Sequence, residues 1–128
     1  MEPRQKKNSI LIVDDDQFLL DMYALKFTEL GFSVLTALSP EDALSSLKEH
    51  KPDVILLDIV MPGMDGFDLL QKIKEEKLSE KSLVIMLSNL GQQSDVDRAK
   101  HVGADGYIVK ASTTPGDVVK KIIEYLEK

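Results

Sequence analysis

The fold is decided by residues 10–16, which read Ile10-Leu-Ile-Val-Asp-Asp-Asp16. Four consecutive apolar residues precede three aspartates, and such a run is typical of a strand buried on both faces of a parallel sheet. The runs Val54-Ile-Leu-Leu57 and Leu83-Val-Ile-Met-Leu87 have the same character. With two more mixed runs, the sequence predicts strands at 9–13, 33–37, 54–57, 83–87 and 106–109.

Segments with the apolar spacing of amphipathic helices lie between these runs, and several begin with capping residues. Ser39-Pro40 and Thr114-Pro115 each place a hydroxyl cap before a proline at the first helical position. Gly31 stands where a helix end takes a positive φ, and Asp65 is expected to cap a helix. The predicted helices span 16–30, 40–50, 66–77, 92–102 and 115–127.

Five strands alternating with five helices predict an α/β fold with right-handed crossovers. We expect a flavodoxin-like, doubly wound, five-stranded parallel sheet of order 2-1-3-4-5 with five helices. Ligands of such sheets bind beyond the carboxyl ends of the strands, at the switch point between the first and third strands. The residues that directly follow the strands are therefore the first candidates for a functional site.

Composition and charge exclude several classes of protein. The 128 residues fit one domain, expected at 9–128 after a flexible, basic tail at 1–8. The net charge of −6 argues against a general nucleic-acid binder. The absence of cysteine excludes disulfides and thiolate metal sites, and two histidines are too few for a histidine-rich one. The sequence shows no signal peptide and no membrane span, so we expect a cytoplasmic protein without membrane insertion.

Polar and charged residues stand directly after four of the predicted strands. Each has an ordinary structural role on its own: Asp16 is expected to cap the following helix, Ser88 could cap a strand end, and Lys110 could be a solvated lysine. The predicted strand order brings these strand ends together at one edge of the sheet. Separate structural roles do not explain why the residues at all four ends suit one chemistry. The gathered residues are Asp14, Asp15, Asp16, Asp58, Ser88, Asn89 and Lys110.

Carboxylates gathered in one shallow pocket repel one another, by about 4 kcal/mol for two charges roughly 4 Å apart at an effective dielectric near 20. Raised pKa values or a bound divalent cation relieve this repulsion. A few hard oxygen ligands that leave room for water suit Mg²⁺ better than a closed calcium cage. Asp58, at the central strand, is the best candidate nucleophile toward a phosphoryl group, whose oxygens Lys110 and Ser88 would contact.

Four motifs carry a family resemblance. They read ILIVDDD at 10–16, LDIVMPGMDG at 57–66, VIMLS at 84–88 and GADGYIVK at 103–110. Taken in this order and spacing, they resemble a response-regulator receiver domain of two-component signalling, of the stand-alone chemotaxis type. The resemblance covers residues 9–127, essentially the whole chain.

The resemblance implies a phosphorylation-controlled switch. Asp58 would accept a phosphoryl group from a histidine kinase or a histidine phosphotransfer protein. Asp14 and Asp15 would hold Mg²⁺ together with Asp58 and the backbone carbonyl of Val60, and Asp15 would be the more direct ligand of the acid pair. The protein would not be an enzyme, beyond assisting its own phosphorylation and a slow dephosphorylation.

The resemblance also implies how the signal leaves the site. Ser88 would be the switch hydroxyl, Lys110 would bind the phosphoryl group, and Tyr107 would change rotamer on activation. These changes would remodel the face formed by the fourth helix, the fifth strand and the fifth helix. A downstream protein partner would respond to that face, unless the chain is a domain of a longer protein.

Four residues depart from the family pattern or bear on its chemistry. Ala111 replaces the proline that commonly follows the lysine, so a cis peptide there would lose its usual advantage. Asn89 replaces a small residue and could crowd the phosphodonor. Val60 and Leu90, at positions that gate the attacking water, are both apolar. We therefore predict an acyl phosphate that hydrolyses slowly.

The helix at 16–30 is unusually apolar, with eight hydrophobic residues among the ten from Phe18 to Phe27. One apolar stripe is enough for a helix that packs on one side. The additional apolar residues either are buried against the helix at 115–127 or form a docking patch for the helices of a partner.

Two alternatives remain open at this point. A haloacid-dehalogenase-type phosphatase would use Asp14 as its nucleophile, although Ser88-Asn89 lacks the further acidic pair that this family needs. A pseudo-receiver would be a binding scaffold without phosphorylation. The complete acid set and Lys110 argue against the scaffold, whereas Ala111 and Asn89 leave it open.

Overall fold

The computed structural model describes residues 8–127, so the predicted tail at 1–8 lies almost entirely outside the described residues. Strands and helices alternate along the chain as predicted, with boundaries that differ by at most two residues. The strand predicted at 83–87 extends to Ser88, and the sequence does not predict the short 3₁₀ turn at Lys110–Ser112. The elements are β1 (Ser9–Val13), α1 (Gln17–Glu29), β2 (Ser33–Ala37), α2 (Pro40–Glu49), β3 (Val54–Leu57), α3 (Gly66–Glu75), β4 (Leu83–Ser88), α4 (Gln93–Val102), β5 (Gly106–Val109), η1 (Lys110–Ser112) and α5 (Pro115–Leu126).

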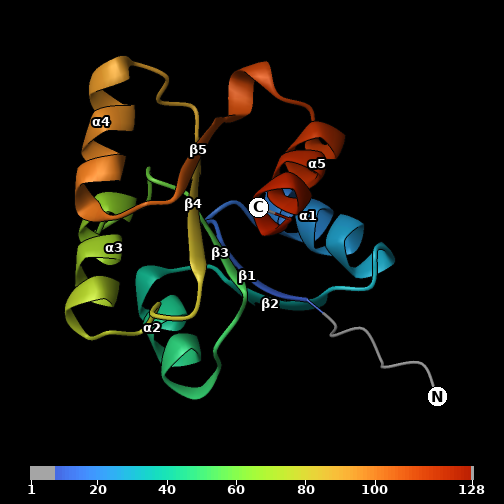
Figure 1. The fold of residues 1–128 in the computed structure, drawn as a ribbon, viewed down its shortest axis with the longest axis horizontal. Helices are drawn as coiled ribbons and strands as arrows, with labels where there is room; N and C mark the ends of the chain where they lie inside the picture. The colour runs from blue at the N-terminus through green and yellow to red at the C-terminus, as the bar shows by residue number, and fades with distance from the viewer. Residues whose placement is uncertain (1–7, 128) are drawn as a thin grey trace.

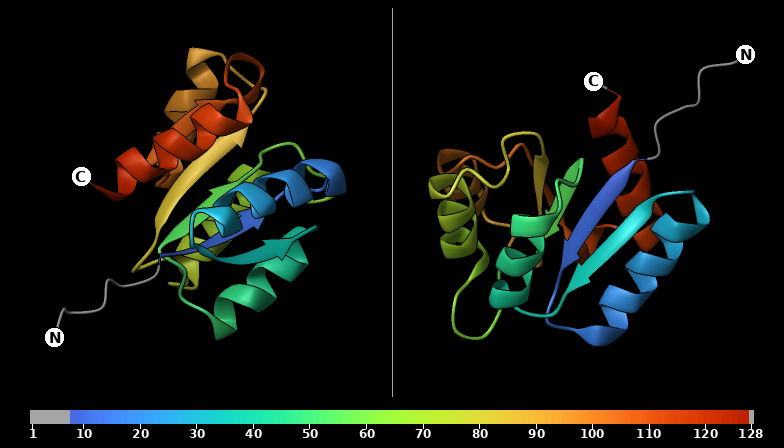
Figure 2. Two further views of the ribbon diagram at one scale, coloured as in Figure 1. Left: turned by 90° about the vertical axis from the view of Figure 1, so that its right-hand side faces the viewer. Right: turned by 90° about the horizontal axis from the view of Figure 1, so that it is seen from below.

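The five strands form one parallel sheet of order β2-β1-β3-β4-β5, which confirms the predicted topology. Helices α2, α3 and α4 cover one face of the sheet, and α1 and α5 cover the other (Figures 1 and 2). The register pairs Val13 of β1 with Leu57 of β3. The residues that follow these two strands, Asp14 and Asp58, therefore begin side by side at the carboxyl edge.

Alternating residues of the central strands fill two separate cores. Leu11, Ile55 and Val84 belong to the core under α2, α3 and α4. Their neighbours Ile10 and Leu56 belong to the core under α1 and α5. Because both faces are buried, these strands are continuously apolar, as the runs in the sequence indicate.

The predicted helix caps are present. The side chain of Asp16 accepts hydrogen bonds from the N–H groups of Phe18 and Leu19, and Asp65 accepts one from Asp68. Ser39 and Thr114 cap α2 and α5 in the same way. Within residues 8–127, no helix is both long and apolar enough to cross a bilayer.

Candidate functional site

The carboxyl ends of β1, β3, β4 and β5 surround an open hollow of about 300 Å³. All seven residues predicted at the strand ends line it. Leu19 of α1 and Val60 of the β3–α3 loop lie at its rim as well, and Leu19 was not foreseen because only the path of α1 brings it there. The lining residues are Asp14, Asp15, Asp16, Leu19, Asp58, Val60, Ser88, Asn89 and Lys110.

Three carboxylates form the core of this hollow. One oxygen from each of Asp14, Asp15 and Asp58 lies within 4.8 Å of the others. Asp14 and Asp58 are buried, whereas Asp15 is exposed. Backbone N–H groups hold the buried pair: Asp16 donates to Asp14 Oδ1 at 2.9 Å, and Ile59 donates to Asp58 Oδ1 at 2.8 Å.

Lys110 joins the two buried carboxylates. Its Nζ lies 2.9 Å from Asp14 Oδ2 and 3.3 Å from Asp58 Oδ2. Burial lowers the pKa of Lys110, but the hydrogen bond to Asp14 and the charges of both carboxylates outweigh burial, so the pKa is raised overall. Lys110 is therefore a firmly protonated cation shared by both carboxylates. The Lys110–Ala111 peptide is trans, as is every peptide bond in the described part of the chain.

The pKa of Asp58 is raised above its ordinary value. Burial is the largest cause, and the charge of Asp14 acts in the same direction. The charge of Lys110 and the hydrogen bonds from Lys110 and Ile59 oppose the increase without cancelling it. Asp58 is thus a carboxylate whose negative charge is incompletely balanced by the protein itself.

The donor set suits a hard divalent cation. Three carboxylates offer oxygen ligands close together, and their total charge exceeds that of the single lysine beside them. Mg²⁺ binds through one or two carboxylates and keeps several waters, which an open hollow permits. Asp14 already accepts hydrogen bonds at both oxygens, so the exposed Asp15 is the freer ligand.

Ser88 lines the hollow and also meets Tyr107 at the loop after β4. The fully buried Ser88 accepts a hydrogen bond at Oγ from Leu90 N–H at 3.3 Å. The hydroxyl of Tyr107 donates to the carbonyl of Leu90. Tyr107 is half-buried, and burial raises its pKa. A change at Ser88 can therefore reach Tyr107 through Leu90.

A sequence model of the family "Response regulator receiver domain" matches residues 10–123. The chain belongs to this family. Among curated proteins, it is 36% identical over 102 residues to "Transcriptional regulatory protein AfsQ1" of Streptomyces coelicolor. That alignment covers 80% of this receiver but only 44% of the relative, so the chain spans less than half the length of that regulator.

Solved structures show the same fold. A CheY-like receiver domain protein of Methanospirillum hungatei JF-1 superposes with a TM-score of 0.85 at 31% identity, covering 95% of each chain. A chain of the CheX–CheY–BeF₃–Mg complex of Borrelia burgdorferi gives a TM-score of 0.84 at 34% identity, covering 94% of this receiver and 90% of that chain. Receivers are signalling phosphoacceptors rather than classical enzymes, so the family argues against the phosphatase alternative.

Replacement of Asp58 by asparagine is expected to stabilise the receiver at neutral pH. A raised pKa means that the folded state holds the Asp58 proton more tightly than the unfolded state, so stability falls as pH rises through that pKa. The Asp58→Asn variant avoids this loss and should be more stable than the wild type at pH 7 in a metal chelator. The difference should narrow toward pH 4, as measured by urea unfolding.

The Asp15→Asn variant provides the control, since Asp15 is exposed and its charge is solvated. It should change stability less than Asp58→Asn at pH 7. A destabilised Asp58→Asn variant, or a difference that does not depend on pH, would contradict the account of the Asp58 charge.

Proposed function

We propose that this receiver is a reversible phosphorylation switch in which Asp58 accepts a phosphoryl group from a histidine kinase or a histidine phosphotransfer protein. The observation that carries the proposal is the charge arrangement around Asp58. Its carboxylate lies 3.3 Å from Lys110 Nζ and shares an oxygen cluster with Asp14 and Asp15. Asp14, Asp15, Asp58 and the Val60 carbonyl would hold Mg²⁺, which when bound neutralises the incoming phosphoryl oxygens.

The protein groups have separate tasks in the transfer. An oxygen of Asp58 forms the new P–O bond as the P–N bond to the donor histidine breaks and the imidazole leaves with the bonding electron pair. The Ile59 N–H fixes the orientation of the Asp58 carboxylate through Oδ1. Lys110 turns from the carboxylates toward the oxygens of the transferred phosphoryl group, because the negative charge of the transition state is spread over these oxygens.

The same geometry supports an output route through the loop after β4. The hydroxyl of Ser88 can donate to a phosphoryl oxygen while its Oγ still accepts from Leu90. Movement of Ser88 then shifts Leu90, whose carbonyl binds Tyr107 of β5. The face formed by α4, β5 and α5 would change and thereby control a downstream protein partner.

Phosphorylation with a small acyl-phosphate donor and Mg²⁺ tests the proposal. Intact mass should show one phosphoryl group on the wild type and none on Asp58→Asn, because the acceptor oxygen is gone. Asp14→Asn should form the adduct at least ten-fold more slowly, because one cation ligand is lost. Asp16→Asn is the matched control: asparagine caps a helix as well as aspartate, so this variant should be modified like the wild type.

The three candidate functions give different outcomes in this experiment. A stable adduct that depends on Asp58 supports the switch. Donor turnover without an adduct, lost in Asp14→Asn, would support the phosphatase. A protein that neither reacts nor turns over the donor would be a scaffold.

The phosphoryl group on Asp58 is expected to persist for minutes or longer. Val60 is an exposed apolar residue that lines the hollow, so its side chain offers no polar group to orient an attacking water. A polar side chain in Val60→Gln should shorten the lifetime several-fold, whereas Val60→Ile should not. Loss of adduct mass after donor removal measures this, and a wild-type half-life of seconds would contradict it.

Helix α1 presents the surface on which the phosphodonor would dock. Its buried stripe is Leu20, Tyr23 and Phe27, whereas Phe18 is 75% exposed and Leu25 is 61% exposed. The apolar excess of α1 is therefore only partly covered by the rest of the fold. Phe18 stands two residues after Asp16, so a partner helix on this patch would lie at the rim of the hollow.

Substitution of Phe18 separates protein donors from small donors. Phe18→Asp should slow phosphotransfer from a phosphorylated histidine kinase that labels the wild type by ten-fold or more, because a charge replaces the apolar contact. The rate with the acyl-phosphate donor should stay the same. Leu30→Asp, exposed at the far end of α1, is the control. An equal loss with both donors would place Phe18 in the chemistry instead.

A further inference from the structure

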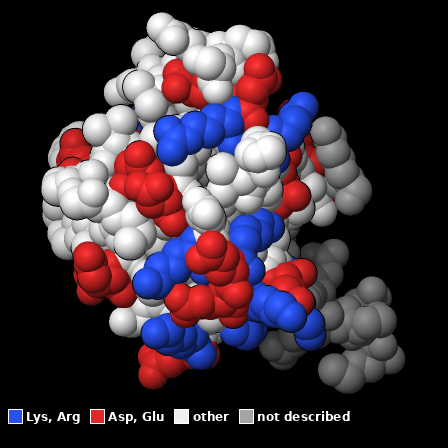
Figure 3. Space-filling view, turned by 90° about the vertical axis from the view of Figure 1, so that its left-hand side faces the viewer, with Lys and Arg blue, Asp and Glu red and all other residues white. Residues whose placement is uncertain are grey.

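Helices α3 and α4 lie side by side on one face of the sheet (Figure 1), and a cation–π contact joins them. The guanidinium carbon of Arg98 on α4 lies 4.2 Å from the ring centroid of Phe67 on α3. Phe67 is only 3% exposed, whereas Arg98 is exposed. Charged side chains of both signs are interleaved over this face (Figure 3), yet Arg98 stacks on a buried ring.

The ring of Phe67 is tied to the backbone of Asp58 through Gly66. Gly66 N–H donates to the carbonyl of Ile59 at 2.7 Å. A Cβ added to Gly66 would lie 2.3 Å from the Asp58 carbonyl oxygen and 2.7 Å from Ile59 Cα. The first turn of α3 therefore packs directly against the backbone of residues 58 and 59, and Phe67 is the next residue of that turn.

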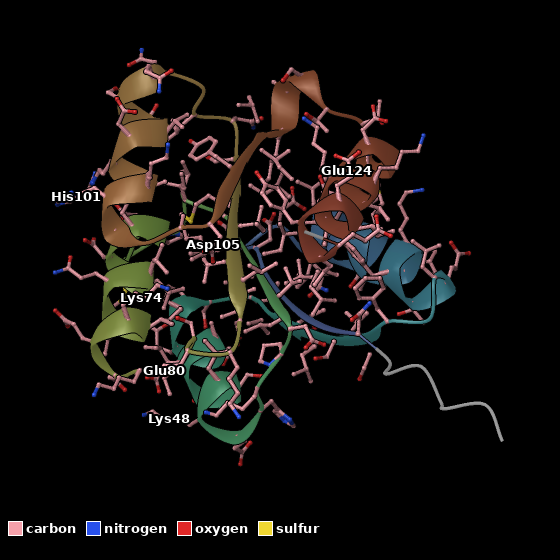
Figure 4. The ribbon with its side chains drawn as sticks, in the orientation of Figure 1. Lys48, Lys74, Glu80, His101, Asp105 and Glu124 are labelled. Carbon is pink, nitrogen blue, oxygen red and sulfur yellow. The ribbon has the colours of Figure 1, made fainter. Side chains whose placement is uncertain are left out.

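Helix α4 buries fewer residues than its neighbour α3. Its one buried residue is Ala99, whereas α3 buries Gly66, Phe67, Leu69, Leu70 and Ile73. Lys74, labelled in Figure 4, extends from α3 at the other end of the pair. A Cβ added to Gly103 would come within 2.9 Å of Lys74 Cε. An element with few buried contacts moves at low cost, so the Arg98–Phe67 contact can take part in setting its position.

We propose that Arg98 is a positioning residue that transmits the phosphorylation state of Asp58 to α4 through Gly66 and Phe67. This inference rests on the proposed function and adds a second route beside Ser88, Leu90 and Tyr107. The two routes start from different atoms, since one begins at the phosphoryl oxygens and the other at the Asp58 backbone. Each link is a direct contact between neighbouring residues, and the movable element is α4 itself.

Hydrogen exchange of the α4 amides, 93–102, tests the inference on the whole chain. Exchange is measured with and without the acyl-phosphate donor and Mg²⁺, and intact mass reports the fraction of Asp58 modified in each sample. The wild type should show a several-fold change in α4 exchange on phosphorylation. In Arg98→Ala this change should fall to less than half, at the same fraction of modified Asp58.

Three further variants distinguish signal transmission from simple packing. Arg98→Lys keeps a cation that can stack on the ring and should restore most of the response. Phe67→Leu keeps an apolar core side chain but removes the ring, so it should reproduce the loss seen in Arg98→Ala. Lys100→Ala removes the same charge from the same helix, away from Phe67, and should respond like the wild type.

The outcomes separate this inference from the proposed function. Failure of the wild type to form an adduct refutes the switch, and the inference with it. An adduct with an undiminished α4 response in Arg98→Ala overturns the inference alone. An equal loss of the α4 exchange response in Arg98→Ala and Lys100→Ala would also overturn it, because the response would then depend on the charge of the helix. Failure of Arg98→Lys to restore the response would overturn it as well, because the response would then depend on general packing rather than on a cation over the ring.

Discussion

The contact on which the site depends is the pair of ion bridges from Lys110 to Asp14 and Asp58. One ammonium faces a cluster of three carboxylates, so negative charge remains in excess even after the backbone N–H groups of Asp16 and Ile59 have donated. The protein therefore holds Asp58 in an environment that its own groups only partly neutralise. A divalent cation would offset this excess, whereas a phosphoryl group would add negative charge, so the arrival of either would redistribute the contacts of Lys110.

The parallel sheet makes this arrangement possible. Its strands end at one edge, and the two-sided core holds each strand too firmly to slide, because a slip of one residue would exchange the residues of the two cores. Asp14 and Asp58 follow strands whose last residues are paired in register. The hydrophobic interior thus sets the separation of the charged groups at the edge, although it takes no part in their chemistry.

The sequence predicts what local chemistry and topology determine. Continuous apolar runs give β1, β3 and β4, capping side chains such as Asp16 and Asp65 give the helix starts, and the strand order gathers the strand-end residues. Other features depend on side-chain orientation across the fold and have no local pattern. The sequence indicates neither the hydrogen bond of Tyr107 to Leu90, nor the stacking of Arg98 on Phe67, nor which apolar residues of α1 stay exposed. The turn η1 is too short to carry a periodic signal.

The sparse anchoring of α4 has a consequence for the diversification of such switches. A helix whose only buried side chain is an alanine can exchange most of its outer residues without creating cavities in the interior. New recognition properties can therefore accumulate on α4 while the acidic hollow and the sheet stay unchanged. Engineering insulated signalling pairs from this scaffold should begin on that helix, where the trade-off between stability and altered specificity is mildest.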